Sequence, residues 1–131
     1  MAGSNAPLRS GLGRVRGLGS AKEGVGHWWS QRLTGLALVP LGLWLAISLV
    51  AHVGLDRAGA VAWLSQPLTV GLLGLTIVAT FHHAALGLQV VVEDYVHREG
   101  VKLAVLILLR AACWGLAAAA LVALLFIAFR G

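Results

Sequence analysis

Three long apolar stretches dominate the chain, and each is long enough to cross a membrane. They run from about residue 28 to 53, from 67 to 92 and from 101 to 129. A helix of about 20 apolar residues spans the hydrocarbon core of a bilayer. Because backbone N–H and C=O groups find no water there, we expect each stretch to be helical. The pattern predicts an all-α integral membrane protein with three transmembrane helices.

The composition agrees with this interpretation. Of 131 residues, 59% are hydrophobic and only 11% are charged, whereas charged residues make up about 25% of a typical soluble domain. The length allows one domain, which we place at residues 27–131. The net charge of +5 raises the question of nucleic-acid binding. We expect none, because the basic residues lie mostly before the first apolar stretch instead of forming one face of a soluble fold.

The segment 1–26 is predicted to be a flexible basic tail. It is rich in Gly, Ser, Ala and Arg and shows no apolar periodicity. The apolar stretch that follows begins too late and is too long for a cleaved secretory signal. We expect a cytoplasmic tail on a protein of the bacterial cytoplasmic membrane. A mitochondrial transit peptide, and hence the mitochondrial inner membrane, is the alternative.

The distribution of Lys and Arg predicts the orientation. Five basic residues lie before or just inside the first span: Arg9, Arg14, Arg16, Lys22 and Arg32. The second connection carries Arg98 and Lys102, whereas the first has Arg57 alone and the C-terminus has Arg130. Basic residues favour the cytoplasmic side. The N-terminus and the second connection are therefore expected in the cytoplasm, and the C-terminus in the periplasm.

Three ionisable side chains lie well inside the predicted spans, away from their ends: His82, His83 and Arg110. Such side chains are costly in lipid and are candidates for function. His83 lies about nine residues, or roughly 13 Å, from the cytoplasmic end of its span. Spacings of three and four residues place four side chains on one face of this helix: Thr76, Thr80, His83 and Gly87.

Two interpretations of His83 stay open at this point. It is either a haem ligand or a histidine that hydrogen-bonds a neighbouring helix. Gly87 removes side-chain bulk beside the imidazole, so a macrocycle or a helix can approach closely. His27 and His52 lie near the ends of the first span, not at the depth of His83. A haem with two histidine ligands would therefore need its second ligand from another polypeptide.

The other two ionisable side chains have less specific interpretations. His82 points about 100° away from His83 and shares its side of the helix with Leu86, Gln89 and Glu93, which suggests a polar contact with a partner helix. Arg110 has three possible roles. It extends to the cytoplasmic interface, stacks on Trp114, or reaches an acidic group such as a haem propionate.

Glu93, Asp94 and Tyr95 end the second span at the membrane surface. They form either a solvated helix terminus with an interfacial tyrosine or part of a quinone site. A quinone carbonyl at this depth needs a hydrogen-bond donor, which a phenol supplies, and a nearby acid orients the phenol. Trp28 and Arg32 are expected at the same membrane surface.

Taken together, these residues resemble a known family. The second span has a histidine, a glycine four residues later, and Asp-Tyr at eleven and twelve: His83, Gly87, Asp94 and Tyr95. This pattern resembles the second helix of the small hydrophobic membrane anchors of succinate dehydrogenases (respiratory complex II). The run Gly-Val-Gly-His-Trp-Trp-Ser-Gln-Arg-Leu-Thr at 24–34 is similar to the start of that family's first helix. The resemblance covers about residues 24–128.

The resemblance implies a partner three-span anchor subunit that shares one haem b with this chain, each supplying one axial histidine. His83 would be the ligand of the haem iron here, with Arg32 near the propionates or the quinone. Tyr95 would hydrogen-bond ubiquinone, supported by Asp94. The adjacent His82 departs from the family pattern, and the spacing to Asp94 favours His83.

The resemblance also implies the wider complex. The two anchor subunits bind an FAD flavoprotein and an iron–sulfur subunit, and electrons from succinate pass to ubiquinone, linking the tricarboxylic acid cycle to the respiratory chain. The chain is not expected to be an enzyme on its own. The alternatives are the anchor of a fumarate reductase and a structural membrane protein without a cofactor.

The orientation leads to a testable expectation. A reporter fused after Arg130 should be active on the periplasmic side, because the basic residues around the first span hold the N-terminus in the cytoplasm. A pair of fusions, one of alkaline phosphatase and one of green fluorescent protein, measures this. Cytoplasmic fluorescence of the fusion after Arg130 would contradict the predicted topology.

Overall fold

The computed structural model describes residues 19–130, and their side chains from residue 24 onward. This part of the chain is helical throughout, apart from short connections. Its helices are α2 (Gly19–Ala51), α3 (Arg57–Leu64), α4 (Pro67–Tyr95) and α5 (Glu99–Arg130). Gly24–Ala51 of α2 and the whole of α4 and α5 are each long and apolar enough to cross a membrane. The prediction of an all-α fold with three long apolar helices is confirmed.

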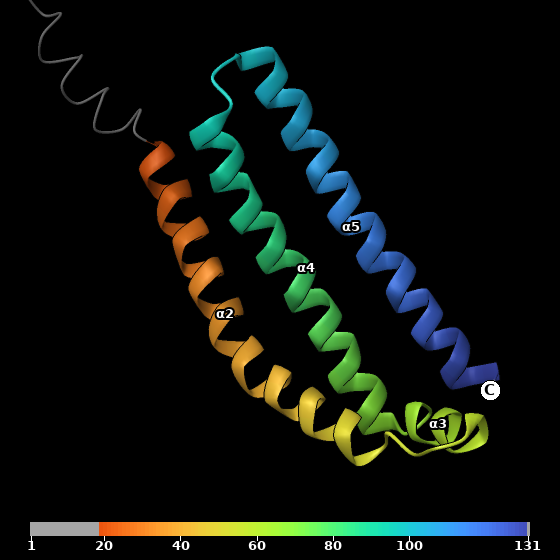
Figure 1. Ribbon diagram of the computed structural model, residues 1–131. Helices are drawn as coiled ribbons and strands as arrows, with labels where there is room; N and C mark the ends of the chain where they lie inside the picture. Colours follow the sequence, from red (N-terminus) through yellow and green to blue (C-terminus); the bar gives the residue numbers. More distant parts are fainter. Residues whose placement is uncertain (1–18, 131) are drawn as a thin grey trace, which may run out of the picture.

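Helix α4 occupies the middle of the arrangement. It packs against both α2 and α5, whereas α2 and α5 do not contact each other. The three long helices alternate in direction (Figure 1), so the N-terminal end of α2 lies at the same end of the molecule as the α4–α5 connection. Helix α3 and the C-terminal end of α5 lie at the other end (Figure 1). Trp28, Arg32, Asp94 and Tyr95 therefore belong to one end, as predicted.

The helices extend beyond the apolar stretches that predicted them. Helix α2 begins at Gly19, inside the segment expected to be a flexible tail, and ends at Ala51. The remainder of that segment, residues 1–18, lies outside the described part of the chain. Helix α4 continues to Tyr95 and is followed by Val96 in an extended conformation. Helical hydrogen bonding does not stop where side chains become polar, so hydropathy alone misplaces these ends.

Pro40 lies within α2 without ending the helix. Figure 1 shows that α2 bows along its length instead of breaking. A proline removes one backbone hydrogen bond and crowds the preceding turn, which bends a membrane helix. The first span is therefore bent but continuous.

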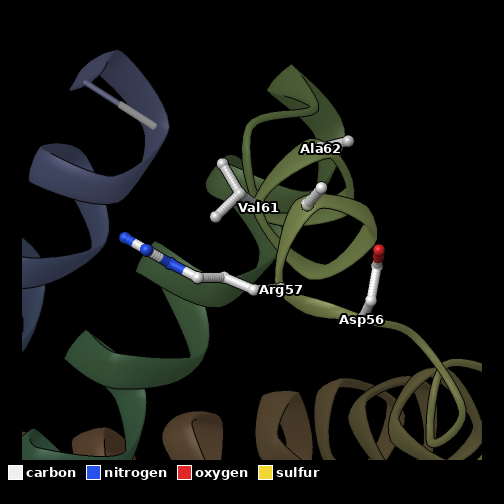
Figure 2. Close-up of a pocket in the computed structure, with 5 residues that line it drawn as sticks. Asp56, Arg57, Val61 and Ala62 are labelled. Carbon is white, nitrogen blue, oxygen red and sulfur yellow. The ribbon is translucent and has the colours of Figure 1, made fainter.

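The short helix α3 was not expected in what the sequence suggested was a polar connection. Asp56 caps its first turn: the carboxylate Oδ1 accepts a hydrogen bond from the Gly59 backbone N–H at 2.8 Å. Figure 2 shows Arg57 extending from the start of α3 toward α5, beside an open hollow that Asp56, Val61 and Ala62 also line. The N-cap aspartate was the available signal for this helix.

Small side chains dominate the contacts among the long helices. The buried residues are Leu41, Thr69, Thr76, Ala79, Ala85, Cys113, Ala117 and Leu124. In lipid there is no hydrophobic force between helices, so close backbone approach across small residues provides the packing energy. Most large apolar side chains of α2 and α5 are exposed. They are available to lipid or to another membrane chain.

Candidate functional site

The imidazole of His83 lies between α4 and α2 and contacts polar side chains at both ring nitrogens. Its Nδ1 is 3.0 Å from the hydroxyl Oγ1 of Thr34, and its Nε2 is 3.3 Å from the carboxamide Nε2 of Gln31. His83 lies twelve residues before Tyr95, the last residue of α4, which is about 18 Å along the helix. The site is therefore an interhelical polar contact at membrane depth.

Glycines on both helices leave room for this contact. A Cβ atom on Gly35 would lie 3.2 Å from Cε1 of His83, which is tighter than ordinary packing. A Cβ atom on Gly87 would lie 3.4 Å from the Nε2 of Gln31. We call Gln31, Thr34, Gly35 and His83 the His83 cluster. Gly87 thus admits a neighbouring helix, which was one of its two predicted roles.

The partners of His83 come from α2, not from its own helix. Thr76 is buried, and its hydroxyl donates to the Leu72 carbonyl one turn earlier. Thr80 is exposed. Neither threonine contacts His83 among the described hydrogen bonds, so only His83 and Gly87 of the face predicted from spacing lie at the site. The three-residue spacing of Gln31 and Thr34 placed them on one face of the first span, but nothing in the sequence aligned that face with His83.

A second group of polar side chains joins α4 to α5. The Arg110 guanidinium donates to Oε1 of Gln89 at 2.8 Å, and Nε2 of Gln89 donates to the Glu93 carboxylate at 2.7 Å. His82 packs against Trp114 with ring centroids 5.7 Å apart. The partner helix expected for the His82 side is therefore α5 of the same chain. Arg110 is thus connected through Gln89 to Glu93, near the C-terminal end of α4. These contacts lie on the side of α4 that packs against α5.

The side chains of Asp94 and Tyr95, at the end of α4, are both exposed. Tyr95 has 80% of its surface accessible, and Asp94 is also exposed. Among the described residues no hydrogen bond joins their side chains. The Arg32 guanidinium lies over the Trp28 ring, 4.9 Å from its centre. This is a cation–π contact, in which the ring face attracts the positive charge. Arg32 forms no ion pair with Glu93 or Asp94 in the described part of the chain.

His52 and His97 contact groups outside the His83 cluster. The Nδ1 of His52 donates to the Ser48 carbonyl at 2.7 Å, and the ring stacks on Trp63. His97 Nδ1 donates to the Tyr95 carbonyl at 3.0 Å. Over the described residues, no three His, Cys, Asp or Glu side chains gather as a metal site would require.

Comparison with known proteins now identifies the family. Residues 6–129 match the family described as "Succinate dehydrogenase/Fumarate reductase transmembrane subunit". The chain belongs to this family. The match covers all three long helices and the His83 cluster, so the resemblance inferred from the spacing of His83, Asp94 and Tyr95 is confirmed.

Several relatives of this chain are named as membrane-anchor subunits of succinate dehydrogenase. A protein of Rickettsia bellii named "Succinate dehydrogenase hydrophobic membrane anchor subunit" is 36% identical over 68% of this chain and 71% of its own length. Similarly named proteins of Rickettsia conorii and Paracoccus denitrificans are 33% and 29% identical, over 76% and 84% of this chain and 80% and 84% of their own lengths. No solved structure matches the chain. The family and the three apolar helices together make this a multi-pass membrane protein.

The close contact at Gly35 generates a prediction. Replacing a glycine inside a helix by alanine normally stabilises it by about 1 kcal/mol. At Gly42 an added Cβ meets nothing within 4 Å, so Gly42→Ala should raise the melting temperature. At Gly35 the Cβ meets the His83 ring, and overpacking offsets the gain by about 1–3 kcal/mol. Gly35→Ala should therefore melt at a lower temperature than Gly42→Ala. Circular dichroism of the two detergent-solubilised variants measures this, and equal melting temperatures would contradict the contact between Gly35 and His83.

Proposed function

We propose that this chain is the membrane-anchor subunit of a succinate:quinone oxidoreductase in a bacterial cytoplasmic membrane. In this role it binds a second cytochrome b anchor subunit and holds an iron–sulfur subunit and an FAD flavoprotein at the cytoplasmic surface. Electrons from succinate pass through the complex to ubiquinone. The observation that carries the proposal is a histidine at membrane depth on the central helix, within a family of succinate dehydrogenase and fumarate reductase membrane subunits.

The surroundings of His83 fit one axial ligand of a haem b. Histidines that bind metals almost always have their other ring nitrogen hydrogen-bonded to the protein, and the Thr34 hydroxyl is in position at Nδ1. Nε2 is then the nitrogen that binds iron. The haem, when bound, supplies one-electron redox chemistry. This chain supplies the imidazole and fixes its depth in the membrane.

The carboxamide of Gln31 must turn away for this ligand to act. Nε2 of His83 would hold the haem iron through the lone pair that faces Gln31 Nε2 at 3.3 Å. That contact is long for a hydrogen bond, and the other end of the amide, Oε1, is buried without a partner in the described structure. The rotation therefore breaks a single weak contact.

The second axial ligand is assigned to the partner anchor subunit. The hydrogen bonds described at the His83 ring come from Gln31 and Thr34 and not from another histidine. His82 packs on the opposite side of α4 against Trp114, and His27 lies on α2, one turn before Gln31. The exposed apolar side chains of α2 and α5 provide surface for a second three-helix chain. The haem is thus proposed to lie between the two subunits and to require both.

The quinone site is proposed at the cytoplasmic end of α4. Tyr95 ends this helix with its side chain exposed, so its phenol is free to donate a hydrogen bond to a quinone carbonyl. Asp94 precedes it and is proposed to orient the phenol once the partner subunits cover this surface. Arg32 belongs to the same end of the molecule, held beside Trp28. It is proposed to lie near the quinone or the haem propionates.

The family description covers both succinate dehydrogenases and fumarate reductases. Relatives from Rickettsia and Paracoccus are named as succinate dehydrogenase subunits, which favours succinate oxidation. The same anchor serves either direction, because direction depends on the potentials of the quinone and the other subunits. The alternative is a structural subunit without a cofactor, and the following experiment distinguishes it from a haem-binding subunit.

The pair His82 and His83 provides a matched test. In membranes from cells that co-express the whole complex, a reduced-minus-oxidised spectrum should show a haem b band. His83→Ala should abolish the band, because the axial ligand is removed, while His82→Ala should retain it. A band that survives His83→Ala, or that is lost only in His82→Ala, would overturn the ligand assignment. No band in the unmodified complex would indicate a structural subunit.

Tyr95→Phe tests the quinone site separately. The substitution removes the phenolic donor but keeps the ring, so ubiquinone reduction should fall about 10- to 100-fold, as expected for loss of one hydrogen bond of about 1.5–3 kcal/mol in the reaction. Succinate oxidation by a soluble dye should be unchanged, because that activity belongs to the flavoprotein. Equal loss in both assays would contradict a role of Tyr95 in quinone binding.

A further inference from the structure

Thr34 lies where one hydroxyl meets three polar atoms. Its Oγ1 is 2.7 Å from the Ser30 carbonyl oxygen, 3.2 Å from the Gln31 carbonyl oxygen and 3.0 Å from Nδ1 of His83. A hydroxyl has one proton to donate and two lone pairs to accept with. Backbone carbonyls only accept, and the bond to Ser30 is the shortest of the three. The proton of Thr34 is therefore used within α2.

The state of the His83 ring follows from this assignment. Because the Thr34 proton points at Ser30, Oγ1 faces Nδ1 with a lone pair, and the 3.0 Å contact requires a proton on Nδ1. The contact at the other end of the ring is consistent with this tautomer, given the carboxamide orientation in which Nε2 of Gln31 faces the ring. The carboxamide nitrogen of Gln31 is a donor, so its 3.3 Å contact requires a lone pair on Nε2. Both contacts select the same neutral tautomer.

We infer that Thr34 is a positioning residue that holds His83 as the Nδ1–H tautomer, with the Nε2 lone pair directed out of the ring toward iron. This inference rests on the proposed function, since it names the residue that prepares the haem ligand. It goes further in assigning that role to a threonine of the first span. The next residue, Gly35, leaves the space in which the ring sits beside the threonine.

The Thr34 hydroxyl has an electronic effect as well as a geometric one. An acceptor at Nδ1–H raises the basicity of a metal-bound imidazole, and a more basic ligand stabilises ferric over ferrous iron. Without this acceptor the Nδ1–H group is left inside the bundle without a partner, which allows the ring to rotate. Loss of the hydroxyl should therefore raise the midpoint potential of the haem and weaken its binding.

The experiment compares Thr34→Val with Thr34→Ser in the purified, fully assembled complex. Valine keeps the shape and removes the hydroxyl, so the midpoint potential should rise and the electron paramagnetic resonance signal of the low-spin ferric haem should shift. Haem transfer to added apomyoglobin should become about 10- to 100-fold more favourable, the range typical for lost partners of metal-bound histidines. Serine keeps the hydroxyl and should restore all three properties.

Thr76→Val is the matched control, because Thr76 is a buried threonine whose hydroxyl also donates one turn back in its own helix, without contact to His83. It should leave the potential and the spectrum unchanged. If Thr34→Val does not assemble, Thr34→Ala replaces it. Alanine removes the hydroxyl without putting a methyl group in its place, and the same three properties can be measured.

The outcomes separate this inference from the proposed function. A haem that depends on His83 but keeps its potential and resonance signal in Thr34→Val or Thr34→Ala overturns the role of Thr34 alone. The same shift in Thr76→Val also overturns it, because the effect would then be one of general packing. Absence of haem b from the unmodified complex overturns both the inference and the haem site.

Discussion

A polar side chain at membrane depth has no water to bond, so it must find a partner on a neighbouring helix. Helix α4 has two sets of such side chains, and each set selects a different neighbour. His83 bonds Gln31 and Thr34 of α2, whereas Gln89 bonds Arg110 of α5. Since lipid offers no hydrophobic force between helices, these polar contacts, together with close packing of small residues, hold the row of three helices in register.

The two contacts differ in what they leave available. On the α5 side, Gln89 links Arg110 to Glu93 through the oxygen and the nitrogen of its carboxamide. On the α2 side, the bond at His83 Nδ1 is 3.0 Å, whereas the contact at Nε2 is 3.3 Å and involves an amide whose oxygen has no described partner. The contact on the α5 side thus only joins helices, whereas the weaker contact at His83 Nε2 is the one that the proposed haem site would replace.

The sequence predicted much of this architecture for clear physical reasons. A bilayer requires about 20 apolar residues per helix, so the lengths of the apolar stretches predicted three spans. The alternating direction of consecutive spans then placed Asp94 and Tyr95 at the same end as Trp28. The spacing of His83, Asp94 and Tyr95 also indicated the family. Helix ends were less accurate: α2 begins at Gly19 because backbone hydrogen bonding continues past the apolar stretch.

The sequence by itself thus determined the number of spans and the family, because each depends on local hydropathy or on spacing within one helix. Only the tertiary structure decided which side chains meet. It paired His83 with Thr34, 49 positions away along the chain, and assigned Arg110 to Gln89. Such pairings depend on the rotation and depth of one helix relative to another, and these are fixed by packing between helices, which helical periodicity does not encode.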